Sequence, residues 1–105
     1  MVKVPDKILE IINNFLDEAA KDNVSIKQAW LFGSYAKGTN HQYSDIDLAI
    51  ISDDFEGVRF YDSQKMDDAM LRTSYDIETH PYRPEDFNEE NPFVREILKH
   101  AIKIL

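Results

Sequence analysis

Two apolar segments, the small-residue turn after the first and the acids before the second constrain this chain more than any other part of its sequence. The first, residues 29–32, runs directly into Gly33-Ser34, and the second, residues 48–51, follows Asp45 and Asp47. Both segments read as buried strands, and because side chains alternate along a strand, the two aspartates are expected on one face. Two neighbouring carboxylates repel each other unless a cation lies between them, and Mg²⁺ prefers oxygen ligands. The sequence therefore predicts a divalent-cation site at the head of the second strand.

The Gly33-Ser34 turn carries the features of an anion-binding loop. Gly33 allows the backbone to come close to a phosphate, and the Ser34 hydroxyl is expected to hydrogen-bond a β- or γ-phosphate oxygen. Lys37, three residues further on, is placed to neutralise phosphate charge, although an exposed lysine is more often simply solvated. An Asp-x-Asp pair alone is also common at a solvated strand start. A cation site beside an anion-binding turn, however, is the layout needed to hold a nucleoside triphosphate.

Composition and charge narrow the classes of partner. The chain has 105 residues, of which 43% are hydrophobic and 30% charged, and it contains no cysteine. We therefore expect residues 1–105 to form one domain without disulfides or thiolate zinc sites. The absence of an apolar run near ~20 residues argues against a membrane span and favours a cytoplasmic protein. A net charge of −8 disfavours direct nucleic-acid binding, which depends on Lys and Arg at phosphates.

The apolar periodicity predicts helices that alternate with short strands. Helical spacing runs from Pro5-Asp6 to about residue 20, over residues 60–72 and onward from Pro92. Strands are predicted at residues 28–32, 45–51 and 74–79, the first of them buried on both faces. Pro81 and Pro84 are expected to interrupt regular structure, and the last four residues either extend the last helix or pair with a strand. This order predicts an α/β (α+β) domain in two layers.

The motif G-S-x10-D-x-D, with Leu31-Phe32 before it and Leu48 after it, resembles the DNA polymerase β-like nucleotidyltransferase superfamily. Within that superfamily the chain is similar to the minimal nucleotidyltransferase (MNT) family. The resemblance implies a nucleotidyltransferase fold, in which a small mixed β-sheet packs against helices. It also implies Mg²⁺-dependent transfer of AMP from ATP, with the phosphates held at Gly33, Ser34 and Lys37.

A two-ion site needs a third carboxylate in addition to Asp45 and Asp47. The predicted third strand offers Asp76 and Glu78 on a shared face, and either could complete the set. MNT proteins with an I-E-x-H-P-type segment resemble residues 77–81 and favour Glu78. Asp45, Asp47 and Glu78 are therefore the predicted catalytic and metal-binding residues. Among the three histidines, His80 is of most interest because it lies beside that acid, but contact with substrate or metal is the less favoured interpretation.

The resemblance also implies a partner. MNT relatives act as antitoxins that adenylylate a tyrosine of a HEPN-type helical toxin, so the acceptor hydroxyl is expected on another protein. The short chain supports this expectation, because it leaves little room for an acceptor pocket of its own. Two alternatives remain at this point: a non-catalytic nucleotide-binding or toxin-neutralising interaction module, and a regulatory subunit of an unknown helical partner.

Overall fold

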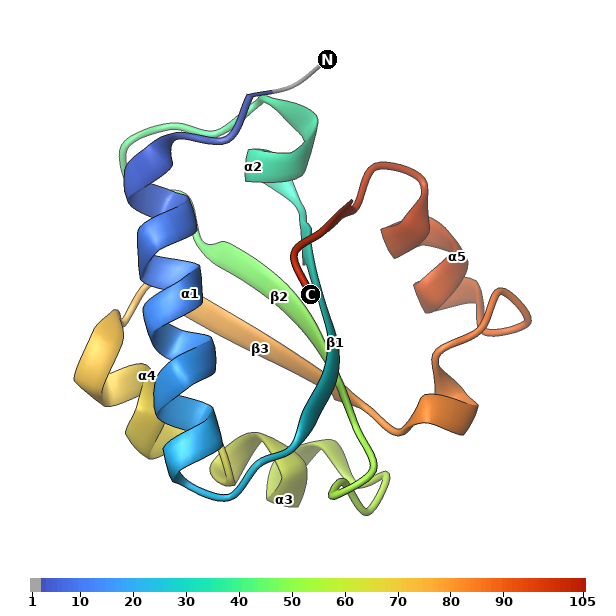
Figure 1. Cartoon of the computed structure of the whole chain (residues 1–105). Coiled ribbons are helices and arrows are strands. Elements are labelled where there is room, and N and C mark those ends of the chain that lie inside the picture. The colour runs from blue at the N-terminus through green and yellow to red at the C-terminus, as the bar shows by residue number, and fades with distance from the viewer. Residues whose placement is uncertain (1–2) are drawn as a thin grey trace.

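The centre of the molecule is a mixed four-stranded sheet in the order β3-β2-β1-β4 (Figure 1). The computed structural model describes residues 3–105, so the first two residues of the predicted domain lie outside the described part. β2 pairs in parallel with β3 and antiparallel with β1, and β4 joins β1 antiparallel. The strands are β1 (Ile26–Phe32), β2 (Ile46–Ser52), β3 (Ile77–Tyr82) and β4 (Ile102–Lys103).

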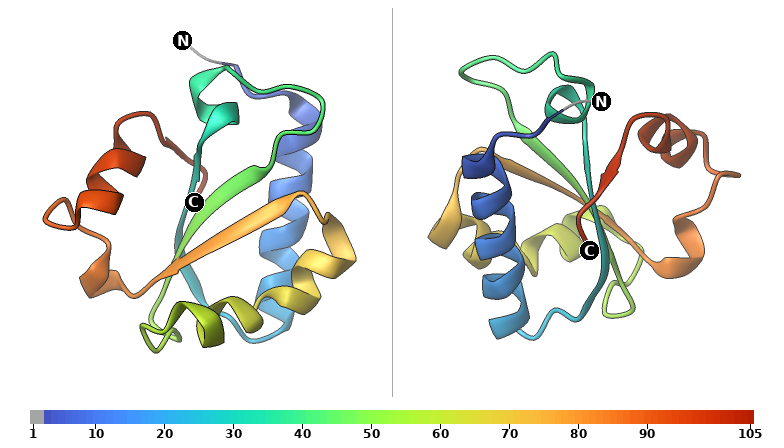
Figure 2. Two further views of the ribbon diagram at one scale, coloured as in Figure 1. Left: turned by 180° about the vertical axis from the view of Figure 1, so that it is seen from behind. Right: turned by 45° about the horizontal axis from the view of Figure 1, so that its top comes forward.

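Helices lie on both sides of this sheet (Figures 1 and 2). On one side is α1, which contacts α4, and on the other is α5, which follows the last long strand. The helices are α1 (Asp6–Lys21), α2 (Ser34–Lys37), α3 (Arg59–Gln64), α4 (Asp67–Thr73) and α5 (Pro92–Leu98), with a 3₁₀ turn at Pro84–Asp86. The α/β (α+β) fold with a small mixed sheet, predicted from the sequence, is confirmed.

Strand alternation divides the sheet into a core face and a site face. Ala29 and Leu31 of β1 are fully buried together with Leu48 and Ile50 of β2, in the same apolar cluster as Phe15 of α1. The residues between them point to the opposite side. On that second face, Phe32 pairs with Asp47, and Asp47 pairs with Glu78. The alternation thus buries one row of side chains and presents the acids on the other.

The prediction that the first strand is buried on both faces was wrong. Ala29 and Leu31 are buried, but Trp30 and Phe32 are only half-buried. Helix α1 seals the core face, whereas the other face is covered partly by the segment around Phe87, whose ring packs near Trp30 at 6.1 Å between centroids. An aromatic side chain tolerates this half-covered position because a large area remains buried even when one edge is open.

The single helix predicted over residues 60–72 is instead two short helices, α3 and α4. Met66, between them, is fully buried, and the chain turns there so that Met66 can enter the core. Lys65 adds a second constraint, because its ammonium donates to the Asp54 carbonyl at 2.8 Å. Periodicity alone could not reveal a break that tertiary contacts impose.

The third strand lies three residues later than predicted. Ser74 to Asp76 form a bend, in which the Ser74 hydroxyl accepts from the Asp76 backbone N–H, and β3 then continues through Pro81. Proline is tolerated because β3 is an edge strand, where one row of N–H groups needs no partner. The expected interruption at Pro81 was therefore wrong, whereas Pro84 does begin the 3₁₀ turn.

The boundaries of helices α1 and α5 follow the sequence signals closely. Helix α1 ends as predicted near Asp22-Asn23, where Asn23 adopts the left-handed conformation (φ 66°) that asparagine accepts. Helix α5 starts at Pro92, and the Asn91 side chain accepts the Phe93 N–H at 3.0 Å. The C-terminal residues pair with β1 instead of extending the helix.

None of the helices in residues 3–105 combines the length and apolar character that crossing a membrane requires.

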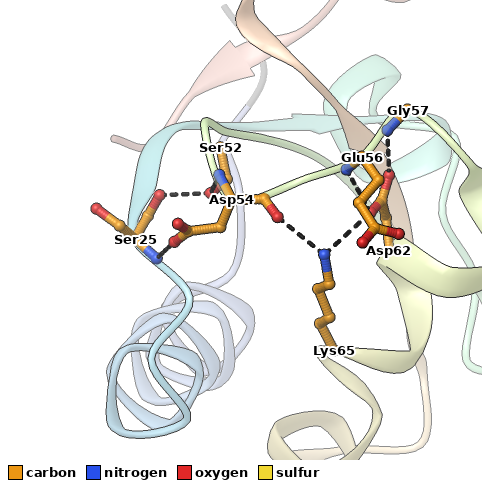
Figure 3. A network of polar contacts seen from close by, with 7 residues as sticks. All are labelled: Ser25, Ser52, Asp54, Glu56, Gly57, Asp62 and Lys65. Carbon is orange, nitrogen blue, oxygen red and sulfur yellow. Dashed lines mark hydrogen bonds and ion pairs between the residues drawn. The ribbon is translucent and has the colours of Figure 1, made fainter.

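A polar network fixes the loop between β2 and α3 (Figure 3). The buried Asp62 carboxylate accepts the backbone N–H groups of Glu56 and Gly57 at 2.8 and 2.9 Å. The Lys65 ammonium lies 3.4 Å from the same carboxylate. Because unsatisfied buried polar groups are costly, these bonds tie the loop to α3. They hold the start of α3, and hence Arg59, against the end of the sheet.

Candidate active site

Three potential ligand side chains meet on the site face of the sheet. Asp47 of β2 and Glu78 and His80 of β3 each place one oxygen or nitrogen atom within 4.8 Å of the others. The His80 Nε2 atom lies 3.5 Å from Asp47 Oδ1 and 3.8 Å from Glu78 Oε1. The parallel pairing of β2 with β3 produces this cluster, because it sets Asp47 opposite Glu78 and leaves His80 two residues further along the same face.

Asp45 and Asp76 lie outside this cluster. Each is exposed and stands one residue before its strand, Asp45 before β2 and Asp76 before β3. The Asp76 carbonyl accepts the Ile46 N–H at 2.7 Å, so its backbone belongs to the strand pairing. The structure thus brings together two of the three predicted acids, Asp47 and Glu78, while Asp45 remains at the exposed head of β2.

Gly33 lies directly against the Asp47 carboxylate. Its φ of 73° with ψ of −150° is a conformation open in practice only to glycine. A Cβ atom at this position would collide with the carboxylate and would come within 3.2 Å of Asp47 Cγ. The glycine is therefore needed twice, for the backbone turn and for the space that the aspartate occupies.

The remaining motif residues surround this turn. Ser34 is half-buried at the first position of α2, and Lys37 is exposed at its last. Ser44, before the aspartate pair, accepts the His41 N–H at 2.8 Å and closes the preceding loop. Ser44 thus acts as a turn hydroxyl at this point of the chain.

A pocket of about 500 Å³ opens beside the cluster, between the sheet and α5. Gly33 and His80 belong to its wall and also contact or face the acids, so Asp47 and Glu78 lie next to this wall without lining it themselves. The wall contains both cationic side chains and apolar side chains of α5. Its lining residues are Phe32, Gly33, Lys37, Arg59, His80, Tyr82, Phe93, Glu96, Ile97 and His100.

The charge of this wall differs from that of the whole protein. Lys37 and Arg59 contribute permanent positive charge, and the one carboxylate in the wall, Glu96, is paired with Lys99 at 2.9 Å. Arg59 also lies 3.8 Å from Glu78, which links the pocket to the acids. Burial raises the pKa of the Tyr82 phenol, and the positive charge of Arg59 opposes that rise. A locally cationic pocket on a protein of net charge −8 favours an anionic ligand.

Arg59 and the α5 residues were missed by the sequence reasoning. Arg59 follows an unremarkable loop, and Phe93 has the spacing of an ordinary core residue, although its side chain is 77% exposed. Helix α3, before β3, brings Arg59 to the site, and the return of the chain over the site face after β3 brings the α5 residues there. No sequence signal short of the tertiary structure could have found them.

The donor set suits a divalent cation. Two carboxylates and an imidazole converge, and the His80 Nε2 atom is buried without a hydrogen-bond partner among the described residues. Buried polar atoms are nearly always satisfied by protein, water or an ion. A cation between these three side chains would neutralise the two carboxylates and satisfy the nitrogen.

The family model described as nucleotidyltransferase domain matches residues 10–104, and the chain belongs to that family. Protein adenylyltransferase MntA of Shewanella oneidensis is 37% identical over 46 residues, which cover 43% of this chain and 33% of that relative. That match spans only about a third of the relative's length, so it shows a similarity of this segment.

Solved structures share the fold. A protein from Sulfolobus solfataricus, described as a nucleotidyltransferase and solved at 1.40 Å resolution, superimposes with a TM-score of 0.64 at 16% identity. That alignment covers 92% of this chain and 78% of the other. A crystal structure of a toxin–antitoxin with AMP-PNP superimposes with a TM-score of 0.55 at 23% identity, covering 88% and 71% of the two chains. At these identities the likeness concerns the fold.

Proposed function

We propose that this protein transfers AMP from ATP to a hydroxyl group, most simply a tyrosine, of a partner protein. The partner is a helical HEPN-type toxin, and this chain is its antitoxin. The observation that carries the proposal is the meeting of Asp47 and Glu78 at the border of a cationic pocket, in a protein whose overall charge is −8. A nucleotidyltransferase domain of residues 1–105 and a cytoplasmic location are part of the same proposal.

The pocket wall offers side chains suited to both the triphosphate and the adenosine part of ATP. Lys37 and Arg59 both belong to the pocket wall and would bind the triphosphate, with Gly33 allowing close backbone approach. Phe93 and Ile97 of α5 supply the apolar surface on which the adenine and ribose would pack. The volume of about 500 Å³ lies in the usual range for such ligands.

Asp47 and Glu78 would hold Mg²⁺, with Asp45 at the head of β2 as the third carboxylate of a two-ion site. Such ions stabilise charge on the attacking and leaving oxygens of an in-line displacement. Gly33 keeps the Asp47 carboxylate in place because no side chain competes for its position. Arg59, 3.8 Å from Glu78, would balance the charge that accumulates there when the triphosphate binds.

The reaction requires a positioned acceptor. The acceptor oxygen forms a bond to the α-phosphorus, the bond from that phosphorus to the oxygen bridging toward the β-phosphorus breaks, and pyrophosphate leaves. The hydroxyl proton passes to a carboxylate or to solvent. Ordering the acceptor in line can be worth ~7–11 kcal/mol of the barrier. A partner docked over the exposed edge of the pocket, beside Lys37 and Phe93, would supply that order.

The relatives support this reading without settling it. The similar protein from Shewanella oneidensis is named a protein adenylyltransferase, and one structural neighbour is a toxin–antitoxin with AMP-PNP. The competing proposal is a module that neutralises its toxin by contact alone. The intact group of Asp47, Glu78 and Gly33 favours catalysis, because contact alone would not need it.

The test incubates the protein with Mg²⁺, ATP and the product of the neighbouring gene, and then measures the intact mass of that partner. We expect one or more AMP groups on the partner, localised to a tyrosine by peptide sequencing, with pyrophosphate released in equal amount. An unmodified partner whose activity is nevertheless inhibited would support the contact-only module. Transfer to RNA or to a free small molecule would contradict the protein acceptor.

A further inference from the structure

His80 occupies a position that nucleotidyl transfer by carboxylate-held ions does not require. Its ring packs edge-on against Phe32, with 4.8 Å between ring centroids, and only 17% of its side chain is exposed. The ring therefore has a fixed orientation, with Nε2 directed at Asp47 and Glu78. A solvated histidine would have neither the packing nor the direction.

The environment of Nε2 is unfavourable in either tautomer of the neutral imidazole unless a cation is present. If Nε2 carries no proton, its lone pair faces two carboxylates, and three electron-rich atoms repel one another. If Nε2 carries the proton, its nearest acceptor is Asp47 Oδ1 at 3.5 Å, too far for a good hydrogen bond. Solvent cannot compensate, because the atom is buried.

The separations between the three atoms suit a shared ion. Two ligand atoms bonded to one ion at roughly 2.1 Å can lie up to about 4.2 Å apart. The distances from Nε2 to Asp47 Oδ1 and Glu78 Oε1, 3.5 and 3.8 Å, already fall within that reach. Only small side-chain adjustments would complete the site.

We propose that His80 is a nitrogen ligand of the metal site and gives this nucleotidyltransferase a preference for a first-row transition ion such as Mn²⁺ over Mg²⁺. The proposal rests on the metal site of the proposed function and refines the identity of its ion. Mg²⁺ favours oxygen ligands alone, whereas imidazole nitrogen binds transition ions well, and Mn²⁺ accepts both kinds of donor. One nitrogen between two carboxylates therefore shifts selectivity without excluding Mg²⁺.

Calorimetric titration of Mn²⁺ and Mg²⁺ into three variants separates the roles of the ligands. His80→Phe keeps a ring against Phe32 but removes the nitrogen, and we expect Mn²⁺ affinity to fall at least about tenfold, with Mg²⁺ affinity nearly unchanged. Glu78→Gln should weaken both ions. His100→Phe, the same change in the same pocket wall but outside the acid cluster, should alter neither. Equal losses for the two ions in His80→Phe would overturn the proposal.

Pulsed electron paramagnetic resonance of Mn²⁺ bound to the unaltered protein tests the bond itself, even if a variant fails to fold. We expect a ¹⁴N coupling from a directly bound imidazole, which changes to a ¹⁵N coupling when the histidines are isotopically labelled. No nitrogen coupling would overturn the His80 assignment, and it would do so even if AMP transfer to the partner proceeds. A nitrogen coupling without AMP transfer would support His80 as a ligand while contradicting the proposed function.

Discussion

Gly33 is required both for the conformation of its backbone and for the space that the Asp47 carboxylate occupies. Gly33→Ala should destabilise the fold, because a conformation disfavoured for other residues costs on the order of 1–3 kcal/mol. It should also sharply weaken MgATP binding, because the new Cβ would displace the Asp47 carboxylate. Calorimetric titration with a non-hydrolysable ATP analogue measures the second effect, and thermal unfolding measures the first.

Gly38 provides the matched control for that substitution. It has a similar φ of 75°, so Gly38→Ala is also strained, but within residues 3–105 no heavy atom crowds the position of its Cβ. We therefore expect Gly38→Ala to lower stability while leaving MgATP affinity close to that of the unaltered protein. Equal affinities in both variants would show that the contact between Gly33 and Asp47 does not matter for binding.

Glu78 and Asp76 were both candidates for the third acid, and the geometry separates them. Glu78 lies opposite Asp47 in the β2–β3 pairing, whereas Asp76 stands one residue before β3 and outside the ligand cluster. Glu78→Gln should lower AMP transfer by on the order of 100-fold or more, as loss of transition-state charge stabilisation does. Asp76→Asn should be the milder change in a single-turnover assay. The reverse order would assign the role to Asp76, and full activity in both variants would remove a third acid from the mechanism.

At the scale of elements, Asp62 couples the β2–α3 loop to α3. Asp62→Asn should lower the free energy of unfolding at pH 7 by about 1–3 kcal/mol, because the buried side chain can then accept only one of the two N–H groups of Glu56 and Gly57. Urea unfolding gives this value. Asp68→Asn, a change of the same kind at an exposed position of α4, should have a much smaller effect.

The pH dependence of this stabilisation has a definite sign. Burial alone would raise the pKa of Asp62, but the N–H donors of Glu56 and Gly57, together with Lys65, hold it below its usual value. The contribution is therefore complete above the pKa of an unfolded aspartate, about 3.9, and is lost as the pH falls through the lower folded value. The stability difference between the unaltered protein and Asp62→Asn should shrink in that acidic range. A constant difference down to pH values below the folded pKa would contradict this role.

Elements were predictable where the local pattern and the tertiary environment agree. The helical period of apolar residues in α1 matches its one buried face. The continuous apolar run of β2 matches a strand buried in the centre of the sheet. The pattern failed where packing decides: Met66 enters the core and divides a helix, and Pro81 persists in β3 because the strand lies at an edge. Similarly, the sequence placed Asp47 and Glu78 among the candidate ligands, but the pocket wall from α5 depends on how the chain returns over the sheet.

At the scale of the whole molecule, the charge of −8 affects how a partner arrives. If the partner presents a basic surface, long-range attraction accelerates the encounter, and salt screens it over about 8–10 Å at physiological strength. We expect the association rate measured by stopped flow to fall as NaCl rises, with a smaller change in the dissociation rate. An association rate independent of salt would contradict electrostatic steering of this complex.

The central claim is that the cluster at Asp47 is the centre of nucleotidyl transfer, and α-labelled ATP tests it most directly. The unaltered protein with Mg²⁺ and its partner should move the α-phosphate label onto the partner, whereas γ-labelled ATP should leave the partner unlabelled. Asp47→Asn should abolish the transfer with the fold retained. Asp53→Asn, the same charge change at an exposed loop position paired with Lys27, should transfer normally. Full labelling by Asp47→Asn would contradict the account.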